Sequence, residues 1–205
     1  GERIHSIKKF NFDYFSLDGS SQLIAKTGYS RIGGFEIYLS RPELGSSLWE
    51  TILEAGRSEN IRPGSPNIID RVEAGLLSFG NEMTVENTPL ECNMDKFLDI
   101  NKEADYIGKK VLQRQIRYGI KRRIRGIIYN GPKLPTISRP LQVFDIDKRT
   151  IVGSLTSGAF SPHFKRNIGV GMIKYGYWDN NKKILVNIAD QEFREGLIKD
   201  LPLIQ

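Results

Sequence analysis

Cysteine and histidine are scarce in this 205-residue sequence, which contains one cysteine and two histidines. A single cysteine, Cys92, excludes a disulfide framework within the chain and is compatible with a reducing cytosol. We interpret Cys92 as a small buried hydrophobic residue rather than a nucleophile. His5 and His163 have no paired cysteines, so we expect no metal site of the zinc type.

Long apolar runs are also missing, and no stretch approaches the roughly 20 residues that a membrane-spanning helix needs. The chain opens without the charged-then-apolar pattern of a secretory signal, so we expect a cytoplasmic protein. It begins with Gly1 rather than methionine, and we expect a processed, tagged or truncated amino end. A phosphate-binding glycine loop, a dinucleotide-binding glycine motif and a Gly-x-Ser-x-Gly elbow are all missing, which makes a self-contained hydrolase unexpected.

What the sequence has in excess is positive charge in its second half. Residues 1–107 carry 11 Lys and Arg against 17 Asp and Glu, whereas residues 108–205 carry 19 against 7. This shift predicts two bodies that join near Gly108. The basic half is open to three interpretations: a surface for nucleic acid, a surface for an acidic partner, or an ordinary solvated face.

The pattern of apolar residues predicts an α+β body followed by an all-β body. Before Lys121 we expect strands at residues 7–17, 22–27 and 35–39, and helices at 42–55, 66–77 and 108–118. From Lys121 onward, strand-like runs follow one another without helices, at residues 125–129, 141–144, 151–156, 168–173 and 184–188. Such spacing is typical of a small barrel or sandwich.

One local pattern suggests chemistry. Glu36 and Tyr38 lie two residues apart on a predicted strand, so their side chains leave the same face, while Phe35, Ile37 and Leu39 leave the other face toward the core. A carboxylate beside a phenol suits a flat heterocycle with adjacent N–H donors, because one carboxylate accepts two parallel hydrogen bonds. The alternative is a half-exposed strand whose polar side meets water.

Three groups of motifs carry a resemblance across nearly the whole chain. Residues 28–37 read GYSRIGGFEI, residues 70–83 read DRVEAGLLSFGNEM, and residues 88–90 read TPL. Residues 106–109 and 157–162 read YIGK and SGAFSP. In order and spacing they resemble the motifs of the glycine cleavage T-protein family, closest to its dimethylsulfoniopropionate demethylase branch. The resemblance implies part of a folate-binding body at 1–107, built of antiparallel sheets with helices. A connecting helix at 108–119 and a small C-terminal β-barrel at 120–205 would follow.

The resemblance also assigns functional residues. The family's folate-contacting glutamate falls on Glu36, and the tyrosine that lies at the folate in the demethylase branch falls on Tyr38. The aromatic residue that lines the substrate pocket falls on Tyr29. The aspartate near the reacting folate nitrogen lies in a part of the family upstream of Gly1, so no catalytic residue is assigned here and we expect a fragment or truncated chain.

Departures from the family pattern bear on the choice of branch. Where T-proteins have Gly-Glu, this chain has Arg31-Ile32, and an arginine implicated in folate contact is replaced by Asn67. Residues 63–69 (PGSPNII) and 160–164 (FSPHF) look like the demethylase versions. The resemblance therefore implies a tetrahydrofolate-dependent methyltransferase that takes its methyl group from dimethylsulfoniopropionate. Aminomethyl transfer, another folate-dependent demethylation and a non-catalytic folate binder remain alternatives.

Expected partners and surfaces complete this interpretation. The cofactor is tetrahydrofolate and the partner is a small-molecule methyl donor, with no nucleic acid, no membrane and a possible homodimer. The basic run at 121–125 (KRRIR) could meet the glutamyl tail of folate, but we favour a solvated edge strand protected by charge. Arg71 and Glu73 are interpreted as a structural ion pair or surface charges. Nucleic-acid binding through the basic half and its aromatic residues is the competing class.

Overall fold

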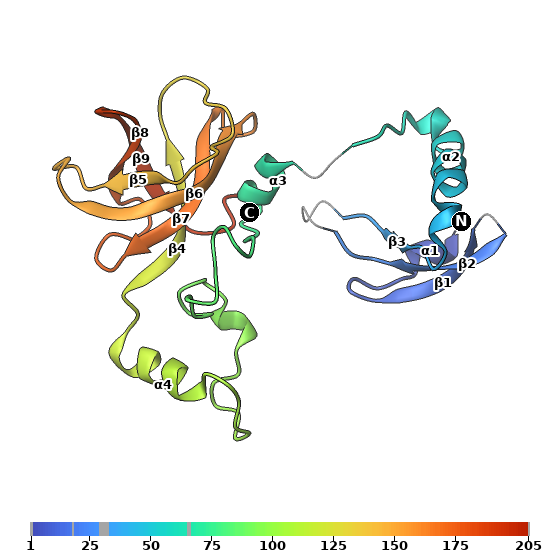
Figure 1. The fold of residues 1–205 in the computed structure, drawn as a ribbon, viewed down its shortest axis with the longest axis horizontal. Coiled ribbons are helices and arrows are strands. Elements are labelled where there is room, and N and C mark those ends of the chain that lie inside the picture. Colours follow the sequence, from blue (N-terminus) through green and yellow to red (C-terminus); the bar gives the residue numbers. More distant parts are fainter. Residues whose placement is uncertain (1, 18, 29–32, 65–66, 205) are drawn as a thin grey trace. The chain divides into compact units, whose positions relative to one another are not determined.

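The computed structural model describes residues 2–17, 19–28, 33–64 and 67–204, and its contacts divide the chain into two compact units. Residues 1–66 form a small unit of helices and one antiparallel sheet, and residues 67–205 form a larger unit around a closed β-barrel (Figure 1). This confirms the expected α+β fold with a C-terminal barrel. The predicted domain boundaries after residues 107 and 119 stay a prediction, because the division by contacts describes compact units rather than functional domains.

The sheet of the first unit has three strands in chain order, and two turns determine where its first strand begins and ends. Its strands are β1 (Phe12–Leu17), β2 (Ser20–Ala25) and β3 (Glu36–Tyr38). Gly19, with φ of 72°, forms the turn between β1 and β2. The first strand starts five residues later than predicted, because Asn11 N–H bonds the Lys8 carbonyl at 3.0 Å and Phe10 is left-handed, with φ of 64°.

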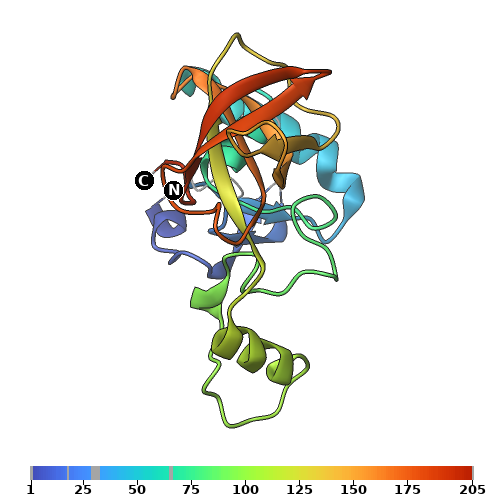
Figure 2. The ribbon, with the colours of Figure 1, turned by 90° about the vertical axis from the view of Figure 1, so that its left-hand side faces the viewer.

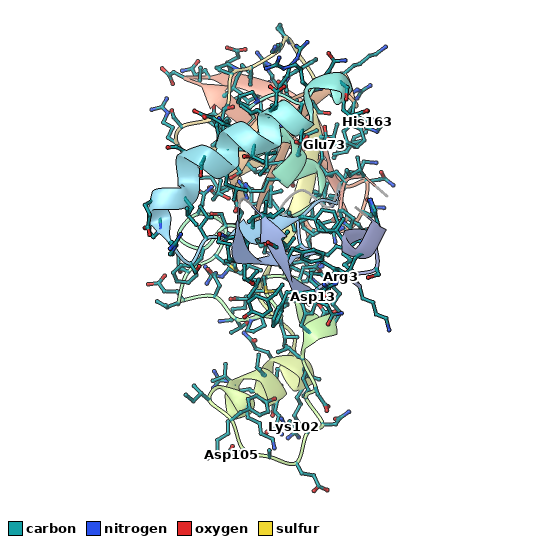
Figure 3. The ribbon with its side chains drawn as sticks, turned by 90° about the vertical axis from the view of Figure 1, so that its right-hand side faces the viewer. Arg3, Asp13, Glu73, Lys102, Asp105 and His163 are labelled. Carbon is teal, nitrogen blue, oxygen red and sulfur yellow. The ribbon has the colours of Figure 1, made fainter. Side chains whose placement is uncertain are left out.

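Helices flank this sheet within the first unit. They are α1 (Glu2–His5), η1 (Pro42–Leu44), α2 (Gly45–Ala55) and η2 (Arg57–Glu59). Arg3 of α1 and Asp13 of β1, both labelled in Figure 3, form an ion pair with an N–O distance of 2.6 Å. Among the described residues of this unit, the buried side chains are Ile7, Gln22, Ile24, Ala25 and Leu48. Gln22 and Ile24 lie on one face of the sheet, whereas Phe12 and Tyr14 on the opposite face are exposed.

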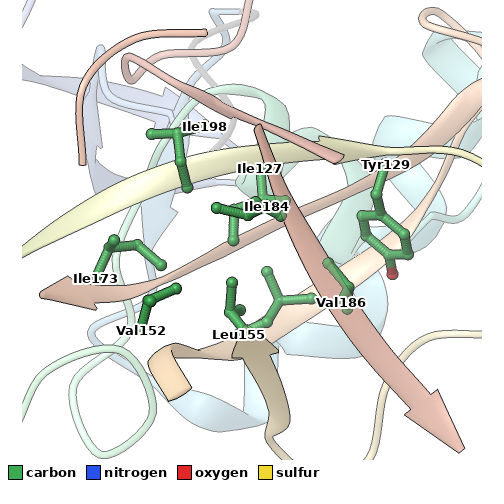
Figure 4. Close-up of a cluster of buried hydrophobic side chains, with 9 residues drawn as sticks. Ile127, Tyr129, Val152, Leu155, Ile173, Ile184, Val186 and Ile198 are labelled. Atoms are coloured by element: carbon green, nitrogen blue, oxygen red, sulfur yellow. The ribbon is translucent and has the colours of Figure 1, made fainter. Parts of the chain in front are cut away.

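The second unit closes six antiparallel strands into a barrel in the order β4-β7-β6-β5-β8-β9, with β9 paired back to β4. The strands are β4 (Arg122–Tyr129), β5 (Leu141–Phe144), β6 (Ile151–Ser161), β7 (Arg166–Lys174), β8 (Lys183–Ala189) and β9 (Glu192–Lys199). Alternate side chains point inward, and Figure 4 shows Ile127, Leu155 and Val186 among those that fill the interior. The barrel is a packed core rather than a pore.

The helices of the second unit are α3 (Ile68–Glu73), η3 (Asp95–Phe97) and α4 (Lys109–Tyr118). Val72 of α3 packs with Ile124, Ile168 and Val170 on the outside of the barrel. The helix α4 and the loop before it project away from the barrel (Figure 2). Within that loop, the Lys109 ammonium donates to the carbonyl of Lys102 at 2.8 Å, and to those of Glu103 and Ala104 at 3.0 Å each.

Two differences from the predicted elements have clear causes. The strand β9 was not predicted, because its sequence EFREGLIK mixes charges and a glycine with its apolar residues. Barrel closure buries Gly196 and Ile198 of this strand. The strand therefore forms because of its pairing with neighbouring strands, which the local sequence pattern does not reveal. Helix α3 ends at Glu73 rather than at residue 77, since Gly75 takes φ of 66° and ends the turn.

None of the helices within the described ranges combines the length and the hydropathy that crossing a bilayer requires.

Candidate functional site

The register of the three-stranded sheet places Glu36 and Tyr38 on one face together with two aromatic side chains. Glu36 pairs with Ala25, which pairs with Phe12. Tyr38 pairs with Leu23, which pairs with Tyr14. Partners in an antiparallel ladder share a face, so the two rows put Phe12, Tyr14, Glu36 and Tyr38 on the same side. We call this the carboxylate face.

The aromatic rings of the carboxylate face are open to solvent. Phe12, Tyr14 and Tyr38 are 59%, 56% and 54% exposed, and the rings of Phe12 and Tyr14 meet edge to face at 6.3 Å. Phe10, just before β1, exposes its ring while its backbone holds a left-handed conformation that bulky residues seldom adopt. Exposed aromatic rings around a carboxylate provide apolar area next to a hydrogen-bond acceptor, which is the composition of a ligand surface.

The Glu36 carboxylate is held by two hydroxyl groups. Thr27 donates its hydroxyl to Oε2 of Glu36, and the Tyr38 hydroxyl lies 3.3 Å from the same oxygen. Among the described residues, Oε1 of Glu36 accepts no hydrogen bond. Within the described residues the carboxylate is therefore fixed through one oxygen, and the lone pairs of the other are available to a hydrogen-bond donor.

The prediction that one side of β3 and its flanking residues face the core is wrong in part. Phe35 and Leu39, which were predicted to point into the core, are each 37% exposed, and only Ile37 is half-buried. The strand has three residues and pairs on one side only, with β2, so it lies at the edge of the sheet. An edge strand this short has too few neighbours to cover flanking side chains. Tyr29, the predicted substrate-pocket residue, lies outside the described residues.

The motif residues of the second unit form buried structural contacts rather than an open site. Arg71 and Glu82 form an ion pair at 2.7 Å, with side chains 6% and 0% exposed. Ser157 of β6 donates its hydroxyl to Glu82 and accepts from Arg71 and from Asn81. The expectation that Arg71 belongs to a structural ion pair is confirmed, although its partner is Glu82 rather than Glu73.

Glu73 has a partner of its own. Its carboxylate accepts the hydroxyl of Ser161, which is fully buried, and its backbone carbonyl accepts the N–H groups of Leu203 and Ile204 at 2.9 and 3.1 Å. The block at residues 70–83 and the serines at 157 and 161 are thus paired in space. These motifs fasten α3 and the C-terminal residues to the barrel.

The basic run that opens the barrel is neutralised by acids of its own unit. Arg122 pairs with Glu91 at 3.0 Å, Arg123 with Asp95 at 2.9 Å, and Arg125 with Asp200 at 2.6 Å. The interpretation of this run as an edge strand agrees with the register, because residues 122–125 pair with β7 alone and the pairing of β4 with β9 begins at Gly126. These arginines already have carboxylate partners, which weakens the expectation that they meet folate carboxylates or nucleic-acid phosphates.

Two further predicted features have structural explanations. Asn67 caps α3, accepting the Asp70 N–H at 2.9 Å through Oδ1. Cys92 is buried, and burial together with the neighbouring Glu91 charge raises the pKa of its thiol. A buried thiol with a raised pKa is a poor nucleophile, as expected from the sequence.

No group of three or more His, Cys, Asp or Glu side chains within the described part of the chain is arranged to hold a metal ion. Sequence reasoning found Glu36 and Tyr38 but missed Thr27, Phe12 and Tyr14. The period-two pattern of β1 predicts that Phe12 and Tyr14 share one face of the strand. Only the register between strands, however, tells which of its faces meets Glu36.

The sequence matches two family models. The GCVT N-terminal domain matches residues 3–102, and the glycine cleavage T-protein C-terminal barrel domain matches residues 122–201. The dimethylsulfoniopropionate demethylase DmdA of Ruegeria pomeroyi is 39% identical over 178 residues, which cover 87% of this chain and 48% of that protein. An aminomethyltransferase of Caldanaerobacter subterraneus subsp. tengcongensis is 36% identical over 200 residues, covering 96% of this chain and 52% of the relative.

A solved structure agrees with the fold. The glycine cleavage system aminomethyltransferase T from Bartonella henselae matches with a TM-score of 0.79 at 20% sequence identity, over 98% of this chain and 54% of that one. The chain therefore spans about half the length of the relatives it matches.

Proposed function

Because the chain belongs to the glycine cleavage T-protein family, we propose that the full-length gene product is a tetrahydrofolate-dependent one-carbon transferase. More specifically, we propose that it transfers a methyl group from dimethylsulfoniopropionate to tetrahydrofolate, giving 5-methyltetrahydrofolate. The higher identity to the demethylase, 39% against 34% and 36% for two aminomethyltransferases, supports this choice of donor.

The observation that carries the proposal is the carboxylate face. Glu36 has one oxygen, Oε1, that no described residue engages, and the exposed rings of Phe12 and Tyr14 lie on the same face as the Tyr38 phenol. The pterin of folate is a flat heterocycle whose amino-pyrimidinone edge carries adjacent N–H donors. Its edge would donate to Glu36 and its faces would lie against aromatic rings, so the residues present fit the group.

When bound, tetrahydrofolate supplies the N5 amine that accepts the methyl group. The contribution of Glu36 and Tyr38 is to orient the pterin, because neither group needs to gain or lose a proton for this role. The sulfonium donor would bring its own leaving group: as its methyl C–S bond breaks, the electron pair would stay on sulfur in a neutral thioether, and the proton that the methyl group replaces would pass to solvent. Positioning of the two reactants therefore supplies most of the rate enhancement.

Aminomethyl transfer is the second candidate, supported by the aminomethyltransferases that match 95% and 96% of the chain. Against it, Asn67 replaces the arginine of the T-protein pattern, and its side chain is occupied with capping α3 and with donating to Asp70 at 2.6 Å. A side chain engaged at a helix terminus cannot take over the contacts of a long guanidinium.

The test is an incubation of the full-length gene product with tetrahydrofolate and dimethylsulfoniopropionate, with the folate product identified by mass. We expect 5-methyltetrahydrofolate and the demethylated thioether in equal amounts. Folate binding without methylated folate would contradict the proposed donor and favour an aminomethyl donor or a non-catalytic folate binder. Salt-sensitive binding of single-stranded nucleic acid in place of folate would overturn the whole assignment.

The partner and the location belong to the same proposal. The partner is the small-molecule methyl donor, without nucleic acid or membrane, and the cytoplasm is the compartment in which the single buried thiol of Cys92 stays reduced. A homodimer also remains a proposal, which the sedimentation of the full-length product would test.

A further inference from the structure

Thr27 lies just beyond β2, where the alternation of the strand carries its side chain to the carboxylate face. Leu23 and Ala25 belong to this face through their pairing with Tyr38 and Glu36, and Thr27 is two residues further along. The Lys26 N–H bonds the Asn11 carbonyl at 2.9 Å, which continues the pairing of the two segments past the end of the strand. The backbone thus delivers the Thr27 hydroxyl to Glu36, and the contact is observed.

The two hydroxyl groups on Glu36 differ in how firmly they are held. Thr27 is half-buried and has a β-branched side chain with one stiff torsion. Tyr38 is more than half exposed, and its hydroxyl lies 3.3 Å from Oε2, near the outer limit of a hydrogen bond. The bond from Thr27 is therefore the fixed one, and the bond from Tyr38 is the one that a ligand can displace.

Counting lone pairs gives the consequence for a ligand. A carboxylate has about four acceptor positions, two on each oxygen. Thr27 and Tyr38 take both positions on Oε2 of Glu36, whereas Oε1 accepts no bond from any described residue. A ligand edge with two adjacent N–H donors needs one position on each oxygen. It takes Oε1 and the place of the Tyr38 hydroxyl, while the bond from Thr27 is kept.

We propose that Thr27 is a positioning residue, which fixes Glu36 through Oε2 so that its carboxylate meets the paired N–H donors of the pterin. This inference rests on the proposed function, since it concerns the same site. It assigns Thr27 no contact with the ligand. Its effect on binding therefore has to pass entirely through Glu36.

The test measures the dissociation constant of tetrahydrofolate for the full-length gene product and its variants by calorimetric titration. Thr27→Val keeps the shape and removes the hydroxyl, and we expect affinity to fall about 5- to 10-fold. Thr27→Ser restores the donor and is expected to bind within about twofold of wild type. Thr51→Val, at an exposed position of α2 in the same unit, is the matched control and leaves affinity unchanged.

A double-mutant cycle separates positioning from a general effect on the fold. If Thr27 acts only through Glu36, Thr27→Val adds no further loss in a Glu36→Ala background, which removes the acceptor of the Thr27 hydroxyl. Losses that add, or a Thr27→Ser variant as weak as Thr27→Val, would overturn the role of Thr27. Should Thr27→Val misfold, which circular dichroism detects, Thr27→Ala serves as the second hydroxyl-free variant.

The two proposals fail in different ways. A wild-type protein that binds no tetrahydrofolate overturns the proposed function and the role of Thr27 with it. A wild-type protein that binds tetrahydrofolate while Thr27→Val binds equally well overturns the role of Thr27 alone.

Discussion

Both compact units contain glutamates that receive hydroxyl hydrogen bonds, but in opposite surroundings. Glu36 of the first unit receives Thr27 and Tyr38 at the surface of an open sheet. Glu82 and Glu73 of the second unit receive serines of β6 in the interior. In the interior no water can replace a lost partner, so the same contact stabilises the fold. At the surface it contributes little to stability, and we propose that it instead fixes an acceptor in place for a ligand.

The largest effect should come from the buried side of this comparison. Arg71→Met leaves the Glu82 carboxylate buried without its cation, and we expect unfolding free energy to fall by about 3–5 kcal/mol. Urea unfolding followed by circular dichroism measures the change.

The matched control is the double variant Arg71→Met/Glu82→Gln, which removes the uncompensated charge and should recover part of the loss. A single variant within about 1 kcal/mol of wild type would show that the pair is not the fastening of α3 that we describe.

A second interior group gives a pH-dependent effect. Burial raises the pKa of Tyr129 to about 12, and its hydroxyl has no hydrogen-bond partner among the described residues. In the unfolded chain this tyrosine ionises near pH 10, whereas in the folded chain it stays neutral up to about pH 12. Between these two pH values only the unfolded state gains free energy from ionisation, so the free energy of unfolding falls as the pH rises from 10 to about 12. The loss is roughly 2–3 kcal/mol.

Tyr129→Phe is the comparison for this effect. It should be at least as stable as wild type in urea unfolding near pH 7, since it removes a buried hydroxyl without a described partner, and it should lose less stability than wild type above pH 10. Identical alkaline profiles for the two proteins would contradict the burial of this phenol.

Glu36→Gln tests the role of the surface glutamate in this comparison. One of the two acceptor oxygens becomes a donor facing N–H groups, and we expect tetrahydrofolate binding to weaken by about 1–3 kcal/mol. The thermal unfolding midpoint should stay near that of wild type, because Glu36 is exposed. Unchanged affinity in a titration would remove Glu36 from the binding site, and a large fall in the midpoint would place it with the structural glutamates.

The smallest effect is expected from Tyr38→Phe. Its hydroxyl makes a long bond to Glu36 that a ligand replaces, so we expect a loss of affinity below about 1 kcal/mol and no change in stability. Titration calorimetry beside Glu36→Gln measures the difference. A loss of affinity as large as that of Glu36→Gln would mean that the Tyr38 hydroxyl binds the ligand directly rather than being displaced by it.

The sequence predicted much of the fold where local pattern determines it. The strand at residues 141–144 and the helix α4 agree with prediction to within one residue, and the shared face of Glu36 and Tyr38 follows from a period of two. Strand β9 was missed, because its mixed sequence becomes a strand only through pairing with β4 and β8.

The candidate site was predicted only as far as one strand. Phe12, Tyr14 and Thr27 join Glu36 through the register between β1, β2 and β3, which depends on the turn at Gly19 rather than on any residue's own propensity. The buried serines that contact Arg71 and Glu73 come from β6, more than 80 residues away, and no local sequence pattern predicts a contact over that separation.

The most direct test of the central claim is a crystal structure of the full-length gene product with tetrahydrofolate. Our account predicts the pterin on the carboxylate face, with two of its N–H groups within hydrogen-bond distance of the two Glu36 oxygens and the Thr27 hydroxyl still on Oε2. A pterin bound elsewhere, with Glu36 facing solvent as it does in the free chain, would contradict the account.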